Sequence, residues 1–220
     1  MEGRVSWSKE YPCKWSTYNA RMEREGKDGE TEHVYDVASF KGAFRKGQFC
    51  LIPIKFAVEA CYWGPTAGKI VRFGRNDGKS LIVIGLWDEW VDRRTREITK
   101  TVTLLTDGPY RYFFDKGHDR SIISVDPQAG RELLLSPSSS YTDNFSIIRS
   151  SRIDHEWMWE PEREMKNGWQ KRCPSKEEMA DVEKTVWSWF QRGKRQLVVY
   201  SWRDPALIAR RFTHINIFAY

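Results

Sequence analysis

Hydrophobic residues gather in short runs separated by turn-forming residues, a pattern typical of β-strands. The run at residues 49–59 is bent or interrupted at Pro53, because proline cannot donate to a sheet ladder. The turn formers Asn76, Asp77 and Gly78 then join two further runs. The runs expected to form strands are 49–59, 69–73, 81–87, 100–105, 121–125, 197–202 and 215–220.

Three segments carry the spacing and end residues of helices. Residues 39–46 place Phe40 and Phe44 on one face. Residues 126–135 open with an Asp-Pro pair, and a helix over 176–192 follows a capping box made by Ser175 and Glu178. Many short strands with few helices predict an α+β fold.

A serine-rich stretch at residues 136–140 is typical of a loop or linker. It suggests a core over residues 1–135 and a Trp-rich C-terminal extension, 136–220, packed on that core. No internal repeat is visible.

The composition excludes a disordered chain or a membrane protein. Of 220 residues 40% are hydrophobic and 30% charged, and no apolar run approaches the ~18–20 residues that span a bilayer. Eleven tryptophans indicate a large core or a surface that stacks on a ligand. The formal net charge of +6 suits a polyanionic partner.

The four cysteines have no spacing that suits zinc, and the four histidines are scattered along the chain. Together with an N-terminus that lacks an apolar signal segment, this predicts a reduced cytoplasmic protein without metal or cofactor.

Three sites combine residues that could support chemistry or binding. Glu59 ends an apolar run, where a carboxylate partly removed from water suits acid–base work; the alternative is a strand-end glutamate in solvent or paired with an arginine. His118 stands beside Asp119 and Arg120 and could shuttle a proton or hold a phosphate, or be a solvated loop residue. In an extended segment, Asn19 and Arg21 would share one face and could grip a phosphate or a base edge.

The order of these motifs resembles that of the SOS response-associated peptidase (SRAP) family, the abasic-site-processing proteins. The family pattern runs from an Asn-Ala-Arg motif through a Cys-Leu-Ile-Pro strand with a glutamate six residues after the proline, to a His-Asp-Arg motif. Here the proline is Pro53 and the glutamate Glu59. The resemblance covers about residues 5–130, in the segments YNARMER (18–24), 39–60, GKIVRF (68–73), IGLWDEW (84–90), TVTLLT (101–106) and GHDRSI (117–122).

The resemblance implies the SRAP fold and binding of single-stranded DNA in a basic groove. Family members capture the aldehyde of an abasic site with an N-terminal cysteine, whose amine and thiol close a thiazolidine ring. The assisting asparagine, glutamate and histidine correspond to Asn19, Glu59 and His118. The residues that would hold the DNA strand are Arg21, Arg120, Trp7, Trp15 and Thr106.

The chain departs from the family pattern where the crosslink would form. Glu2 stands where the family has its cysteine, and Cys13 carries no free α-amine. The Asn-Ala-Arg motif comes after only 18 residues, so we expect the domain to be shortened at its N-terminus. Val58 and Ala60 replace the aromatic neighbours of the glutamate. The cysteine-dependent crosslink is therefore expected to be lost.

Three functions follow as hypotheses. The first is an SRAP-like protein that recognises single-stranded or abasic DNA without the thiazolidine link, in a bacterial cell or encoded by a phage or mobile element. The second is an abasic-site lyase or hydrolase that uses Glu59 and His118. The third is a scaffold that binds a host protein through its C-terminal tryptophans, although most of these are expected to be core. Those tryptophans are Trp157, Trp159, Trp169, Trp187, Trp189 and Trp202.

Overall fold

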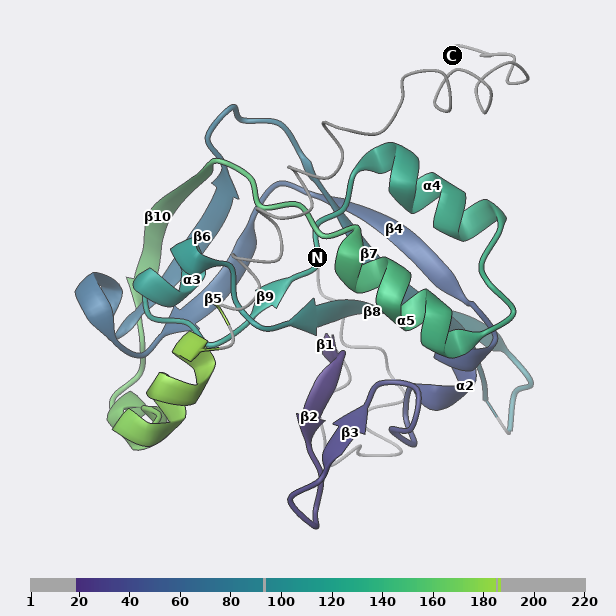
Figure 1. Cartoon of the computed structure of the whole chain (residues 1–220), viewed down its shortest axis with the longest axis horizontal. Coiled ribbons are helices and arrows are strands. Elements are labelled where there is room, and N and C mark those ends of the chain that lie inside the picture. The colour runs from purple at the N-terminus through teal and green to yellow at the C-terminus, as the bar shows by residue number, and fades with distance from the viewer. Residues whose placement is uncertain (1–18, 93, 185, 187–220) are drawn as a thin grey trace.

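The computed structural model describes residues 19–92, 94–184 and 186, which form an α+β fold of two main sheets, a small hairpin and short helices (Figure 1). Trp7, Trp15 and the strands predicted at 197–202 and 215–220 lie outside the described residues. The strands are β1 (Asn19–Arg21), β2 (Glu23–Glu25), β3 (Thr31–His33), β4 (Phe49–Ile54), β5 (Ala57–Cys61), β6 (Lys69–Arg75), β7 (Leu81–Val91), β8 (Ile98–Asp107), β9 (Ser121–Ile122) and β10 (Trp157–Glu164). The helices are α2 (Lys41–Arg45), α3 (Arg111–Asp115), α4 (Pro127–Leu135), α5 (Tyr141–Ser150) and the 3-10 turns η1 (Gly64–Thr66) and η2 (Trp169–Arg172).

The larger sheet has the order β1-β8-β7-β4, with β9 pairing to β8. Among the described strands of this sheet, β1 and β8 pair in parallel and the other pairs are antiparallel. Successive side chains of β7 alternate between the two faces, so Leu81 and Val83 enter one core while Ile84 and Leu86 enter the other. The sheet therefore separates two hydrophobic cores.

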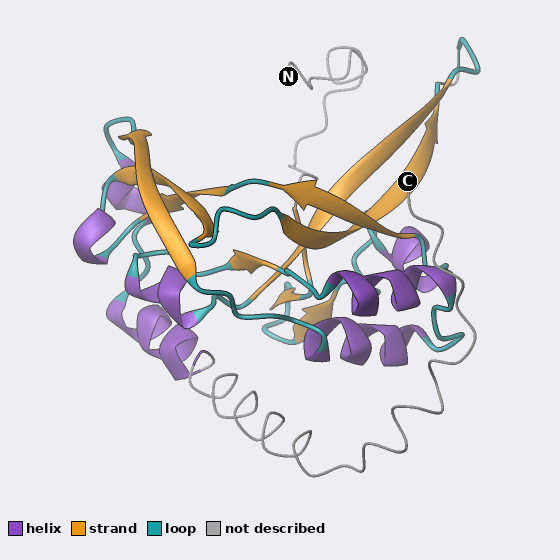
Figure 2. Cartoon of the chain, turned by 90° about the horizontal axis from the view of Figure 1, so that it is seen from above, coloured by secondary structure: helices purple, strands orange, loops and turns teal. Residues whose placement is uncertain are grey.

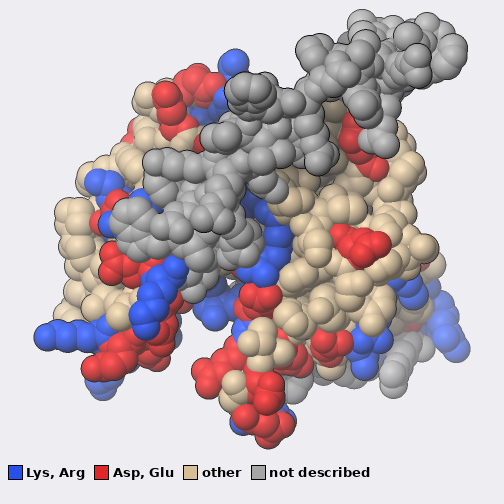
Figure 3. Space-filling view, in the orientation of Figure 1, with Lys and Arg blue, Asp and Glu red and all other residues tan. Residues whose placement is uncertain are grey.

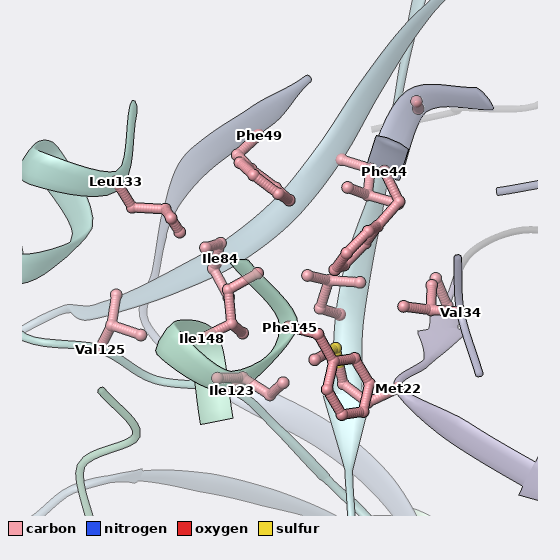
Figure 4. Packing of buried hydrophobic residues seen from close by; sticks show 14 residues of the cluster. Met22, Val34, Phe44, Phe49, Ile84, Ile123, Val125, Leu133, Phe145 and Ile148 are labelled. Carbon is pink, nitrogen blue, oxygen red and sulfur yellow. The ribbon is translucent and has the colours of Figure 1, made fainter. Parts of the chain in front are cut away.

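The first core lies between this sheet and helices α2, α4 and α5. Figure 4 shows Phe145 beside Met22, with Phe44 pointing toward them. Phe44 and Ile148 are fully buried. Figure 2 shows the helices gathered along one side of the strands.

The second core lies beneath a three-stranded antiparallel sheet of order β10-β6-β5. Phe73 of β6 stacks on Phe113 of α3, with ring centroids 4.1 Å apart. Trp157 of β10 packs edge-on against the same Phe113. Strand β5 is an edge strand of this sheet, and this position leaves Glu59 near the loop that follows α3.

The expected run 49–59 forms two strands in different sheets. β4 pairs with β7, whereas β5 pairs with β6. The break falls at Lys55 and Phe56, where the chain leaves one sheet for the other, and Pro53 remains inside β4 opposite Ile82. The interruption is therefore real but lies two residues later than expected.

The other expected elements agree more closely with the structure. Helix α2 falls within the predicted 39–46, and α4 ends at Leu135 as predicted, with Asp126 as its N-cap. Residues 176–184 are helical, and the Ser175–Glu178 capping box is formed in both directions. Among the described residues, no helix is long and apolar enough to cross a membrane.

Candidate functional site

A carboxylate–imidazole pair joins β5 to the loop that precedes β9. The Nε2 atom of His118 lies 3.2 Å from Oε2 of Glu59, and the two side chains are only 5% and 18% exposed. The other ring nitrogen, Nδ1, lies 2.8 Å from the carbonyl oxygen of Ala60. One imidazole therefore bridges the side chain of one β5 residue and the main chain of the next.

These contacts define which atoms can carry the proton. A carbonyl oxygen only accepts, so Nδ1 is the donor to Ala60. The Nε2–Oε2 contact then needs one proton, held either by the imidazole or by the carboxyl group. The pair can therefore give a proton to a bound substrate or take one from it, as acid–base chemistry requires.

Two arginines share one carboxylate immediately beside this pair. Asp119 Oδ2 lies 3.5 Å from Nη2 of Arg21, and its Oδ1 lies 3.5 Å from Nε of Arg120. All three side chains are between 33% and 39% exposed. Two guanidinium groups against one carboxylate leave a net positive charge that water can reach.

Electrostatics within this cluster favour an added anion. Burial, and after it repulsion by the nearby Arg120, lowers the pKa of Arg21, while Asp119 acts in the opposite direction. The Nε of Arg120 is buried. It lies within ion-pair distance of Asp119 but makes no hydrogen bond among the described residues. A phosphate between the two arginines would relieve their repulsion and accept charge-assisted hydrogen bonds. Figure 3 shows lysine and arginine atoms gathered near the centre of the drawn face, with acidic atoms beside them.

Strand register places Asn19 and Thr106 relative to Arg21. Arg21 pairs with Thr106, and Asn19 pairs with Leu104, in the parallel β1–β8 ladder. Asn19 and Arg21 lie on the same side of β1, because Ala20 between them points into the first core. Asn19 is exposed, whereas Thr106 is 2% exposed and its hydroxyl has no hydrogen-bond partner among the described residues.

The predicted residues are thus brought together to different degrees. Glu59 contacts His118 directly, and Arg21 and Arg120 meet at Asp119. Asn19 shares a strand face with Arg21, but no hydrogen bond joins it to Glu59 or His118 in the described part of the chain. Trp157 and Trp159 pack in the second core, while Trp187, Trp189 and Trp202 lie outside the described residues, as do Trp7 and Trp15.

Two contributors to the site were not assigned a role from the sequence. The main-chain carbonyl of Ala60 orients the imidazole, and a main-chain role leaves no mark on residue type. Asp119 joins the two arginines; its position between His118 and Arg120 in the sequence was the available signal. Within residues 19–92 and 94–184, no group of three or more metal-ligating side chains is found.

Comparison with known proteins gives a fold but no family. No family model matches the chain, and no curated protein matches it. Among solved structures, it is similar to a structural-genomics crystal structure of a protein from Bordetella bronchiseptica, with 23% identity, a TM-score of 0.54, and coverage of 73% of this chain and 72% of the other. A second, from Bacteroides thetaiotaomicron, has 20% identity, a TM-score of 0.51, and coverage of 70% and 60%. The chain therefore shares the fold of these two proteins.

Proposed function

We propose that this protein is an SRAP-like DNA-binding protein that recognises single-stranded or abasic DNA without forming a cysteine-dependent crosslink. The observation that carries the proposal is the Arg21–Asp119–Arg120 cluster beside the Glu59–His118 pair. The arginines provide charge for the phosphate backbone, and the buried pair provides polar groups for the sugar of one nucleotide. Phosphate contacts of this kind position a strand without reading its sequence.

The noncovalent character follows from the chemistry of the cysteines in the sequence. A thiazolidine needs a thiol and a free α-amine on one residue, and Cys13, Cys50, Cys61 and Cys173 are all internal. Cys61 is buried, and burial raises the pKa of its thiol, so its reactive thiolate is disfavoured. We therefore expect reversible binding at abasic sites.

The test compares two single-stranded oligonucleotides that differ only by one abasic site. On a native gel, both oligonucleotides should shift, and raising the salt concentration should weaken both complexes. On a denaturing gel, neither should show a slow-migrating adduct. An adduct that survives denaturation and disappears in Cys13→Ala would show that another thiol has taken over the crosslink and would overturn the noncovalent proposal.

The Glu59–His118 pair favours a second candidate, cleavage of the strand at the abasic site. A carboxylate and an imidazole 3.2 Å apart have the composition of an acid–base pair. The same denaturing gel detects this activity as a shortened abasic oligonucleotide. Cleavage that is lost in both Glu59→Gln and His118→Gln would favour the lyase over the binding protein.

A further inference from the structure

A second concave site lies on the opposite face of β5 from Glu59. Ala57 and Cys61 enter the second core, so Ala60 points outward, because side chains alternate along a strand. Ala60 and Ile70 of β6 belong to the lining of a cleft of about 370 Å³. Its aromatic lining comes from Tyr62 and Trp169. This volume is within the range of small-molecule pockets.

The walls of this outer pocket are held in place by contacts to the segment after β5. The indole of Trp169 lies against Gly68, where an added Cβ would come within 2.9 Å of the ring. The amide of Met165 donates to the Gly68 carbonyl at 2.8 Å, and the thiol of Cys173 donates to the Tyr62 carbonyl at 3.4 Å. The aromatic surface is therefore largely preformed, which lowers the entropic cost of binding.

The rim of the pocket is predominantly cationic. Arg163, Lys166 and Arg172 contribute positive charge, against one carboxylate from Glu164. Arg163 already pairs with Glu162, whereas Lys166 and Arg172 have no ion pair among the residues that the structure describes. Asn167 adds an amide that can both donate and accept.

We infer that the outer pocket binds a nucleotide, with its base against Trp169 and Tyr62 and its phosphate at Lys166 and Arg172. Aromatic faces stack on any base, and ammonium and guanidinium groups hold a phosphate. Asn167 and Glu164 supply hydrogen-bonding groups for the edge of the base.

The position of the pocket suggests where this nucleotide comes from. Ala60 belongs to both sites, since its carbonyl accepts from His118 and it lines the outer pocket. β5 is the outer strand of the β10-β6-β5 sheet, and the Tyr62 amide donates to the Gly117 carbonyl beside it, so a DNA strand that reaches both sites passes over the loop that carries His118. The assignment of this nucleotide to the same bound strand rests on the proposed function, whereas the pocket itself rests on its own lining.

The experiment separates the free nucleotide from the DNA strand. Titration with thymidine, inorganic phosphate and thymidine 5′-monophosphate, followed by NMR, should show the monophosphate binding at least about tenfold more tightly than either half. Trp169→Ala and Lys166→Ala should each weaken that binding several-fold, while Trp169→Phe retains most of it. The control is Lys41→Ala, which removes an exposed lysine from α2, a helix that packs on the first core. This variant should bind the monophosphate as tightly as the wild type.

The outcomes distinguish the pocket from the proposed function. The pocket would be overturned if the monophosphate did not bind, or if Trp169→Ala and Lys166→Ala left its binding unchanged. It would also be overturned if O-phosphotyrosine bound more tightly than thymidine 5′-monophosphate. A single-stranded oligonucleotide whose affinity falls in the same variants would support the pocket as part of the DNA path. If the monophosphate binds and no oligonucleotide does, the pocket stands and the proposed DNA function fails. Melting temperatures of all variants show whether each remains folded.

Discussion

The ring of His118 is oriented by two contacts that come from neighbouring residues of one strand. Nδ1 is bonded to the carbonyl of Ala60, and Nε2 faces the carboxyl group of Glu59. Because the ring is 5% exposed, water replaces neither contact easily. Removing the imidazole would leave a poorly solvated carboxyl group without its partner, which costs more than the hydrogen bond alone contributes.

We predict that His118→Ala lowers the free energy of unfolding by about 1–3 kcal/mol, the range for a buried polar group that loses its partner. Glu59→Gln should cost less, because the amide can still hydrogen-bond to the imidazole. Chemical denaturation measures both values. Equal stability of the wild type and His118→Ala would show that the pair contributes nothing to the fold.

Asp77 gives a prediction about pH. Hydrogen bonds from Arg75 and then from the Lys79 amide lower the pKa of the Asp77 carboxyl group to about 2. Its ordinary value in an unfolded chain is about 3.9. The carboxylate therefore stabilises the folded state above about pH 4, and this contribution is lost as the pH falls toward 2.

Asp77→Asn should be less stable than the wild type at neutral pH, and the difference should disappear near pH 2. Thermal melting across this range provides the measurement. A difference between the two proteins that does not change with pH would mean that the Arg75–Asp77 interaction does not depend on charge.

The sequence motifs predicted which residues form the site better than they predicted which residues contact one another. Glu59 and His118 were found because both stand in ordered motifs, although 59 positions separate them in the chain. Arg21 was assigned to the DNA strand from the sequence, and in the structure its guanidinium lies against the carboxylate of Asp119. That pairing depends on how the parallel β1–β8 ladder approaches the loop after α3, and such long-range geometry leaves no local sequence signal.

At the scale of whole elements, local signals at helix ends predicted more than hydrophobic runs did. The Asp-Pro start of α4 and the capping box at Ser175 were visible because caps act through nearby main-chain amides. The run 49–59 gave no sign that its two halves join different sheets, since both halves are apolar on their buried faces. Helix α5 was not predicted; it begins directly after the serine-rich stretch 136–140, and Ser140 caps it by accepting from the Asp143 amide.

Asp126 provides the element-scale prediction. Its Oδ1 accepts hydrogen bonds from the amides of Gln128 and Ala129, at 2.9 and 3.2 Å. Asp126→Ala should destabilise the protein by about 1 kcal/mol, whereas Asp126→Asn should retain most of the stability, because asparagine also caps helices. Denaturant unfolding of the two variants side by side measures this difference, and equal losses in both would contradict the capping role.

At the scale of the whole molecule, the candidate site lies where the two sheets approach each other. Arg21 comes from the larger sheet, Glu59 from the smaller one, and Asp119 from the loop between α3 and β9. Strand β10 pairs with β6, so residues far apart in the chain complete the smaller sheet. The α+β class followed from the strand and helix patterns, but the pairing of these strands depended on contacts that the patterns do not encode.

The measurement that tests the DNA-binding proposal most directly is the salt dependence of single-stranded DNA binding by the wild type, Arg21→Ala and Arg120→Ala. We predict that the wild-type affinity falls steeply between about 50 and about 200 mM salt. Each variant should bind more weakly by roughly 1 kcal/mol or more on every sequence, and its salt slope should be shallower by about one phosphate equivalent. If the wild type shows no salt-sensitive binding at low ionic strength, or if both variants lose thermal stability but keep the wild-type affinity and slope, the arginine cluster is structural and the account is contradicted.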